Sequence, residues 1–166
     1  MNPSALSQAG ELVIVSLQCR PKPARRILVV EDDDGIRHIN AVVLAHSGYQ
    51  VDAAEDGAAA WDRLQQNRYD LMVTDNDMPK VSGVELLHKL HAAHIALPVI
   101  LATGTLPAAD FTQYPWIQQV ALLLKPYSFH ELLGTVRNVL RATDPSCEEA
   151  APPNWQTGPM TGDLQC

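Results

Sequence analysis

The sequence is poor in aromatic residues and in basic charge, and each shortage excludes a class of protein. Only 5% of its 166 residues are aromatic, and Lys and Arg number 12 against 19 Asp and Glu, for a net charge of −7. Because proteins hold phosphate backbones mainly through Lys and Arg, so acidic a chain is a poor candidate for binding nucleic acid. The composition is otherwise ordinary for a globular protein, with 46% hydrophobic and 19% charged residues.

Long apolar runs and paired cysteines are also missing. The stretch Leu12–Leu17 is interrupted by Ser16 and falls far short of the roughly 18 residues that span a bilayer. Basic residues follow this stretch, which is the reverse of a secretory signal. The three cysteines, Cys19, Cys147 and Cys166, share no metal-ligand spacing. We therefore expect a cytoplasmic protein without a membrane span, whose thiols stay free in a reducing compartment.

Proline-rich ends flank a central region with regular apolar periodicity. We expect residues 1–24 to form a flexible leader, with at most a short strand at Glu11–Leu17. Residues 144–166 are acidic and rich in proline, and they predict a disordered tail in which Trp155 has enough apolar area to dock. Residues 25–143 then form a single domain.

Short apolar runs alternate with segments of helical periodicity in this central region. Strands are predicted at Ile27–Val30, Gln50–Ala54, Asp70–Thr74, Pro98–Ala102 and Val120–Leu124. Helices are predicted from near Asp34 with Ile36, Ile39 and Val43 on one face, over Gly57–Gln66, through Val84–Leu90, in the less regular stretch Pro107–Trp116, and from Phe129 to Leu140. This alternation predicts a doubly wound α/β fold, in which a five-stranded parallel sheet is covered on both faces by five helices.

Polar residues follow four of the predicted strands. Acidic residues Glu31–Asp34 follow the first strand, Asp75–Pro79 the third, Thr103 and Gly104 the fourth, and Lys125 and Pro126 the fifth. In a doubly wound fold the site lies at the carboxyl ends of the strands, so these residues should converge. Converging carboxylates repel one another unless a cation intervenes, and carboxylate oxygens without His or Cys suit Mg²⁺. Together with a hydroxyl and an ammonium group, they predict a pocket for a phosphoryl group.

Four segments resemble the receiver domains of bacterial two-component response regulators, the CheY-like family. They are RRILVVEDDDGIR, VTDNDMPKVSG, VILATG and LLLKPYS, and the resemblance covers roughly Arg25–Thr143. It implies a flavodoxin-like sheet with strand order 2-1-3-4-5. It also implies that Asp75 accepts a phosphoryl group from the phosphohistidine of a sensor histidine kinase or a histidine phosphotransfer protein.

The same resemblance implies a role for each residue at the strand ends. Mg²⁺, or Mn²⁺, would be held by Glu31, Asp32, Asp75 and the backbone carbonyl of Asp77. Thr103 and Lys125 would bind the phosphoryl group and switch the conformation. Asn76, Met78, Pro79, Gly104, Pro126 and Leu122 would border the site. Leu122 stands where the family usually has the aromatic residue that moves with the switch, so Tyr114, Trp116 or Tyr127 are candidates to replace it.

The output of such a domain is a contact with another protein. No DNA-binding or enzymatic motif follows Arg141 in the sequence. We therefore expect a single-domain response regulator, a phospho-accepting signalling protein rather than an enzyme, that contacts an unknown downstream protein target or relays the phosphate. The resemblance is also compatible with a weak homodimer.

Two other functions stay open at this point. The first is a receiver-like binding module that is not phosphorylated. The second is a haloacid-dehalogenase-type phosphatase. Asp75-Asn76-Asp77, Thr103 and Lys125 mimic the first three motifs of that family. Its remaining acidic motif follows the lysine, however, whereas the acidic cluster of this sequence comes first. A metal site formed by His88, His91 and His94 is disfavoured, because the third residue turns away from the helix face that the first two share.

Overall fold

The computed structural model describes residues 24–105, 113–114, 116–117 and 120–143. The predicted tail, nearly all of the predicted leader and most of the stretch 107–116 lie outside these residues. The predicted extent of the domain therefore stays a prediction at both ends. The described part of the chain contains no helix that is long and apolar enough to cross a membrane.

The described residues form the predicted alternation of strands and helices. In chain order the elements are β1 (Arg26–Val30), α1 (Asp34–His46), β2 (Gln50–Ala54), α2 (Gly57–Gln66), β3 (Leu71–Asp75), α3 (Gly83–Ala92), β4 (Val99–Thr103), β5 (Ala121–Leu124) and α5 (Phe129–Ala142). All strand pairs are parallel, and the order in the sheet is β2-β1-β3-β4-β5. The predicted doubly wound fold and its strand order are confirmed. Four helices are described, because the fifth was predicted in residues that mostly lie outside the description.

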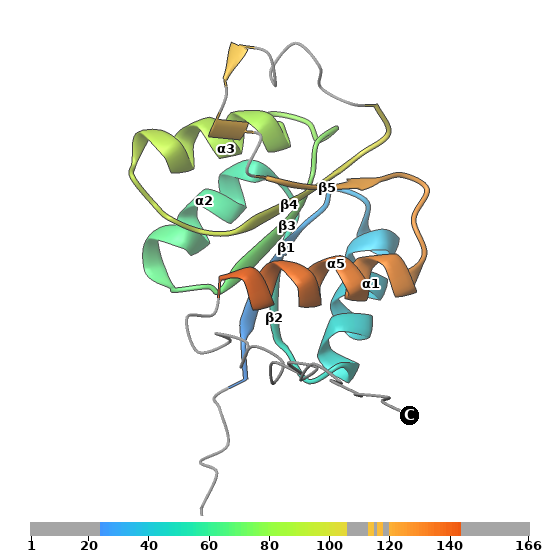
Figure 1. Cartoon of the computed structure of the whole chain (residues 1–166). Coiled ribbons are helices and arrows are strands. Elements are labelled where there is room, and N and C mark those ends of the chain that lie inside the picture. Colours follow the sequence, from blue (N-terminus) through green and yellow to red (C-terminus); the bar gives the residue numbers. More distant parts are fainter. Residues whose placement is uncertain (1–23, 106–112, 115, 118–119, 144–166) are drawn as a thin grey trace, which may run out of the picture.

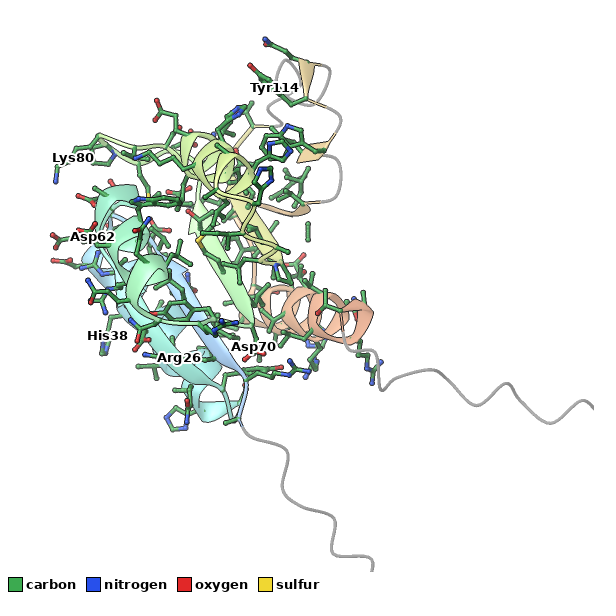
Figure 2. All side chains as sticks on the ribbon, turned by 90° about the vertical axis from the view of Figure 1, so that its left-hand side faces the viewer. Arg26, His38, Asp62, Asp70, Lys80 and Tyr114 are labelled. Atoms are coloured by element: carbon green, nitrogen blue, oxygen red, sulfur yellow. The ribbon has the colours of Figure 1, made fainter. Side chains whose placement is uncertain are left out.

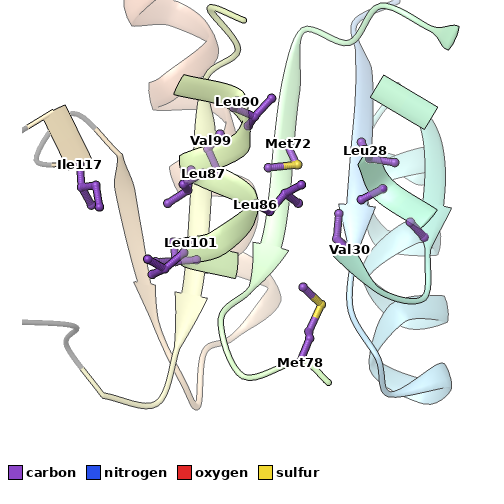
Figure 3. Close-up of a cluster of buried hydrophobic side chains, with 13 residues drawn as sticks. Leu28, Val30, Met72, Met78, Leu86, Leu87, Leu90, Val99, Leu101 and Ile117 are labelled. Atoms are coloured by element: carbon purple, nitrogen blue, oxygen red, sulfur yellow. The ribbon is translucent and has the colours of Figure 1, made fainter. Parts of the chain in front are cut away.

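The helices form one layer on each face of the sheet. In Figure 1, α1 and α5 lie on one side of the strands and α2 and α3 on the other. Each layer closes its own hydrophobic cluster. Leu44 of α1 and Leu132 and Val136 of α5 pack on one face, and Leu86, Leu87 and Leu90 of α3 on the other. Figure 3 shows this second cluster, in which Met72 and Leu101 point from the central strands towards α3.

The central strands are apolar because helices cover both of their faces. Every residue of β3 and of β4 is buried, whereas the edge strand β2 exposes Gln50 and half-buries most of its other residues. Such strands read as continuous hydrophobic runs rather than as alternating ones. This explains why the apolar runs locate β3 and β4 to within one residue.

Polar side chains cap the start of each helix. The carboxylates of Asp33 and Asp56 accept hydrogen bonds from the first turns of α1 and α2. Ser82 and Ser128 form reciprocal capping boxes with the Glu three positions later at the starts of α3 and α5. These caps satisfy backbone N–H groups that have no partner within the helix, and they fix where each loop ends.

Helix α1 differs from its predicted orientation. The spacing of Ile36, Ile39 and Val43 indicates an apolar face, yet Ile36 is 40% and Ile39 is 44% exposed. The residues that α1 buries are Asn40 and Leu44. The helix is thus turned so that a polar amide enters the core and two isoleucines face outward. Periodicity alone cannot reveal this, because it does not identify which neighbours the helix meets.

The loop after β3 packs closely against the start of α3. A Cβ atom on Gly83 would lie 2.4 Å from the backbone oxygen of Asp75 and 2.7 Å from Leu101 Cδ1. A Cβ on Gly134, in the middle of α5, would meet nothing within 4 Å. The same substitution should therefore have opposite effects at the two positions.

We predict that Gly83→Ala lowers the free energy of unfolding by about 1–3 kcal/mol, because the new methyl group displaces the backbone at the end of β3. Gly134→Ala should instead raise it by about 0.5–1 kcal/mol, because alanine loses less backbone entropy in a helix. Urea unfolding of the two variants beside the parent protein measures both effects. Equal stability of the Gly83→Ala variant and the parent would contradict the close packing.

Candidate functional site

The carboxyl ends of β1, β3, β4 and β5 bring the predicted site residues to one edge of the sheet. The register pairs Val30 with Thr74 and Thr103 with Leu124. Glu31 therefore follows β1 beside Asp75, which is the last residue of β3, while Lys125 follows β5 beside the end of β4. Parallel pairing alone places these groups together, as expected for a doubly wound sheet.

Three carboxylates form the acidic part of the site. Oxygens of Glu31, Asp32 and Asp75 all lie within 4.8 Å of one another, and this is the single cluster of potential metal ligands among the residues that the structure describes. Glu31 and Asp75 are 3% and 4% exposed, whereas Asp32 is exposed. Oxygen ligands of this kind, with one side open to water, fit the preference of Mg²⁺ for carboxylates and retained waters.

Lys125 supplies the counter-charge to the buried carboxylates. Its Nζ lies 2.7 Å from Asp75 Oδ2 and 3.3 Å from Glu31 Oε2. The ammonium group thus bridges the ends of β1 and β3 from the end of β5. A buried ion pair of this kind depends on both partners, because removal of one leaves an uncompensated buried charge.

The environment shifts the pKa of both Glu31 and Lys125 upward. Burial raises the pKa of Glu31 to about 7, and the nearby Asp75 carboxylate adds to this, against the opposing effect of Lys125. Burial disfavours the charged form of Lys125, but the hydrogen bonds and charges of Asp75 and Glu31 outweigh it and raise its pKa. Without a metal ion, the Glu31 carboxyl therefore keeps its proton up to about pH 7, at the place where a divalent cation is expected to bind.

Backbone contacts hold Asp75 in place. The N–H of Asp77 donates to Asp75 Oδ1 at 3.3 Å, and the N–H of Asn76 donates to the carbonyl of Ala102 at 2.8 Å. The N–H of Gly83 donates to the carbonyl of Asn76 at 3.1 Å, which ties the loop to the start of α3. Asp75 is thus fixed from β4 and from α3 as well as from Lys125.

Arg37 fixes the backbone of the acidic pair after β1. Its guanidinium donates to the carbonyl oxygens of Glu31 and Asp32, at 2.7 and 3.2 Å, and forms an ion pair with Asp34. The sequence does not single out this residue. Its location three positions after Asp34, the first residue of α1, is the signal that could have suggested the ion pair, since i and i+3 residues share a helix face.

A salt bridge across the loop after β3 is a second contact that sequence analysis misses. Lys80 Nζ lies 2.7 Å from Asp56 Oδ2, and the Asp56 side chain is 7% exposed. Hydrogen bonds from the α2 backbone, first from Ala59, and from Lys80 lower the pKa of Asp56. Figure 2 shows Lys80 at the opposite end of the molecule from Arg26 and Asp70. This salt bridge ties the loop that follows Asp75 to α2.

Thr103 is buried, and its hydroxyl is engaged within its own loop. It donates to the carbonyl of Thr105 at 2.6 Å and accepts from the Thr105 N–H at 3.3 Å. The backbone carbonyl of Thr103 accepts from the N–H of Lys125 at 2.9 Å. The predicted hydroxyl and ammonium groups therefore lie on adjacent strands, joined through the backbone.

The predicted bordering residues have different surroundings. Pro79, Gly104 and Pro126 are exposed, and Asn76 is half-buried with Nδ2 donating to Asp77 Oδ1 at 3.2 Å. Asn76 Oδ1 is buried and has no hydrogen-bond partner among the described residues. Met78 and Leu122 instead belong to the hydrophobic cluster under α2 and α3. Figure 3 shows Met78 beyond the end of β3.

The aromatic residues predicted to replace the switch aromatic contact histidines of α3 or a residue of α1. The Trp116 ring stacks on the His91 ring, and the Tyr114 ring meets the His88 ring edge-on, with 4.4 Å between the ring centroids in each pair. His94 follows the end of α3 and is exposed. Tyr127 accepts a hydrogen bond from Asn40. The histidines of α3 thus contact aromatic rings and form no metal-ligand group in the described part of the chain.

The comparison with known proteins agrees with this geometry. A family model described as "Response regulator receiver domain" matches residues 27–137. Response regulator MprA of Mycobacterium sp. (strain KMS) is 34% identical over 120 residues, which are 72% of this chain and 52% of that protein. MprA of Mycobacterium tuberculosis is 34% identical over 126 residues, 76% of this chain and 54% of that protein. The chain thus spans about half the length of the curated relatives it matches.

Solved structures show the same fold. The receiver domain of Francisella response regulator 1452 is similar with a TM-score of 0.65 and 27% identity, over 72% of this chain and 99% of that one. Chemotaxis response regulator CheY4 of Vibrio cholerae has a TM-score of 0.63 and 25% identity, over 70% of this chain and 98% of that one. Response regulator TrrA of Thermotoga maritima, solved in complex with Mg²⁺ and BeF, has a TM-score of 0.60 and 28% identity, over 69% of this chain and 98% of that one.

The raised pKa of Glu31 predicts how stability depends on pH in the metal-free protein. The folded protein holds the Glu31 proton up to about pH 7, whereas the unfolded chain loses it near 4.5. The contribution of Glu31 is therefore full below the unfolded pKa and is lost as the pH rises through the folded pKa. In EDTA, the stability of the parent relative to Glu31→Gln should fall between about pH 5 and about pH 8.

Urea unfolding at several pH values measures this difference. Asp32→Asn is the matched control, because it removes the exposed acid of the same cluster and leaves Glu31 in place. The parent and the Asp32→Asn variant should share the pH-dependent fall, and the Glu31→Gln variant should lack it. A fall that persists in Glu31→Gln would contradict the assignment to Glu31.

Proposed function

Because this chain belongs to the family of response regulator receiver domains, we propose that Asp75 accepts a phosphoryl group from a phosphohistidine. The donor is a sensor histidine kinase or a histidine phosphotransfer protein. The observation that carries the proposal is the Lys125 ammonium group between the buried carboxylates of Asp75 and Glu31. The proposal includes the cytoplasmic location at which such donors phosphorylate their partners.

The acidic cluster provides the ligands for a divalent cation. Glu31, Asp32 and Asp75 would hold Mg²⁺ or Mn²⁺ through carboxylate oxygens, together with the backbone carbonyl of Asp77. When bound, the ion neutralises the carboxylates and the incoming phosphoryl oxygens, so that the anionic donor can approach. TrrA, a similar protein, is solved with Mg²⁺ and BeF, and this supports the same ligand chemistry here.

The transfer itself is a nucleophilic substitution at phosphorus. A carboxylate oxygen of Asp75 forms the new O–P bond while the P–N bond of the phosphohistidine breaks. The electron pair of the broken bond leaves on the imidazole nitrogen, which takes up a proton. Lys125 exchanges its contact with Asp75 Oδ2 for a phosphoryl oxygen, so its charge stays paired throughout.

Thr103 can report the new charge to the rest of the molecule. Its hydroxyl now donates to the carbonyl of Thr105, and a phosphoryl oxygen would be a stronger, charged acceptor. The exchange of one acceptor for the other moves the loop after β4. Phosphorylation thereby shifts an equilibrium between two surface conformations, and a downstream protein binds the phosphorylated one.

Exposed apolar side chains beside the site favour a protein as phosphodonor. Ile36 lies in the first turn of α1, Leu124 immediately precedes Lys125, and Phe129 begins α5. They are 40%, 53% and 46% exposed. A protein that brings a histidine to Asp75 would bury these side chains, which a small phosphodonor would leave in water.

We predict that the parent protein gains the mass of one phosphoryl group when it is incubated with acetyl phosphate and Mg²⁺. Asp75→Asn should gain none, because the amide oxygen is not a nucleophile, and EDTA should prevent the gain in the parent. Asp62→Asn is the matched control, because Asp62 is an exposed acid on α2 outside the acidic cluster, and this variant should still be labelled. Intact-protein mass spectrometry makes the measurement.

Two outcomes would contradict the proposal. In the first, the parent gains no phosphate under conditions that label a control receiver domain, which would favour the unphosphorylated binding module. In the second, the parent steadily releases phosphate from unrelated monoesters, which would favour the phosphatase.

A further inference from the structure

Asn40 is a buried polar residue on α1, a helix whose other buried residue is Leu44. Its side chain is on the core-facing side of α1 and the residue is 3% exposed. A buried amide is destabilising unless it forms hydrogen bonds, so its partner matters. Leucine at this position would be the ordinary choice for a helix that packs on a sheet.

The partner of Asn40 is Tyr127, in the segment between β5 and α5. Asn40 Nδ2 donates to Tyr127 Oη at 3.0 Å across 87 positions of sequence. Tyr127 is two residues after Lys125, and its ring packs against the hydrophobic cluster that contains Leu44 and Leu132. This hydrogen bond therefore ties the chain that carries Lys125 to α1.

The hydrogen bond joins two parts of the chain that lie next to opposite charges of the site, the Glu31 carboxylate and the Lys125 ammonium group. Helix α1 begins three residues after Glu31, and the segment after β5 begins with Lys125. The Lys125 backbone is anchored on its other side by the hydrogen bond to the Thr103 carbonyl. The charges of Glu31, Asp75 and Lys125 also act on the pKa of Tyr127, which burial raises, so the hydroxyl lies within their electrostatic reach.

We propose that Asn40 and Tyr127 are positioning residues that hold Lys125 at Asp75, so that its ammonium group is placed to bind the phosphoryl group. The inference rests on the function proposed above. It adds that a hydrogen bond between α1 and the segment after β5 sets where the Lys125 ammonium group lies. The two residues act through Lys125 and do not themselves touch the reacting atoms.

This role predicts opposite effects on two ligands. Lys125 supports a bound phosphoryl group, but it competes with a metal ion for Asp75 and Glu31. A less well positioned Lys125 should therefore weaken the binding of the phosphoryl analogue beryllofluoride and leave Mg²⁺ binding equal or tighter. General loosening of the fold would weaken both ligands, so the pair of measurements separates positioning from damage.

The test compares three variants by calorimetric titration with Mg²⁺ alone and then with beryllofluoride at saturating Mg²⁺. Tyr127→Phe removes one oxygen and keeps the ring, and Asn40→Leu removes the amide. We expect each to bind beryllofluoride about fivefold more weakly, the equivalent of one typical hydrogen bond. Asn40→Leu/Tyr127→Phe removes both polar groups, so it should regain stability in urea while its beryllofluoride affinity stays low.

A matched control removes a similar hydroxyl far from the site. Tyr69 Oη donates to Asp52 Oδ2 at 2.9 Å near the start of β3. Tyr69→Phe should bind both ligands as the parent does, even where its stability falls.

The outcomes distinguish the two proposals. If the parent binds no beryllofluoride in the presence of Mg²⁺, the proposed function fails and this inference fails with it. If the parent binds it and Tyr127→Phe and the double variant bind it equally well, only the positioning role is refuted. Weaker binding of both Mg²⁺ and beryllofluoride by all three variants also refutes it, because that result indicates structural damage.

Discussion

The contact between one ammonium group and two buried carboxylates is the interaction on which the rest of the site depends. Burial of Glu31 and Asp75 without Lys125 would leave like charges together in a region of low dielectric, which is strongly unfavourable. The raised pKa of Glu31 shows that Lys125 does not fully compensate for burial and for the Asp75 charge. The remaining imbalance is relieved by a proton or by a cation. This imbalance of charge supports the proposal that the acidic cluster binds a divalent cation, which in turn allows an anionic group to approach.

The surrounding structure holds this arrangement from several directions. Arg37 fixes the backbone after β1, Gly83 allows α3 to begin against the backbone of Asp75, and the Lys80–Asp56 salt bridge ties the intervening loop to α2. Each of these contacts joins a loop at the carboxyl edge to a helix. The helices therefore anchor the loops around Asp75, whereas the Thr103 hydroxyl, among the residues that the structure describes, bonds to the backbone of Thr105 in its own loop. This contrast supports the proposal that a phosphoryl group on Asp75 moves the loop after β4 and leaves the sheet in place.

Most of the fold was predictable from the sequence. Strands covered on both faces are continuously apolar, so the runs Asp70–Thr74 and Pro98–Ala102 locate β3 and β4 to within one residue, and the α5 pattern locates the last helix. The orientation of α1 was not predictable, because Asn40 enters the core and Ile36 does not. The hydrophobic period of a helix indicates an apolar stripe, but the partner that the helix meets decides which residues are buried. Here that partner includes the hydroxyl of Tyr127, which lies 87 positions away in the chain.

For the site, the sequence by itself determined which chemical groups are present and that they converge, because parallel strands place their carboxyl ends at one edge. Carboxylates after β1 and β3, a hydroxyl after β4 and an ammonium group after β5 follow from that rule alone. Only the tertiary structure decided which of them are in contact: Lys125 bridges Asp75 and Glu31, Asp32 faces water, and the Thr103 hydroxyl bonds to Thr105. The Asn40–Tyr127 hydrogen bond and the Lys80–Asp56 salt bridge are also contacts that only the tertiary structure decided. They depend on distances between residues remote in sequence, and those distances are set by the packing of helices on the sheet rather than by any local pattern.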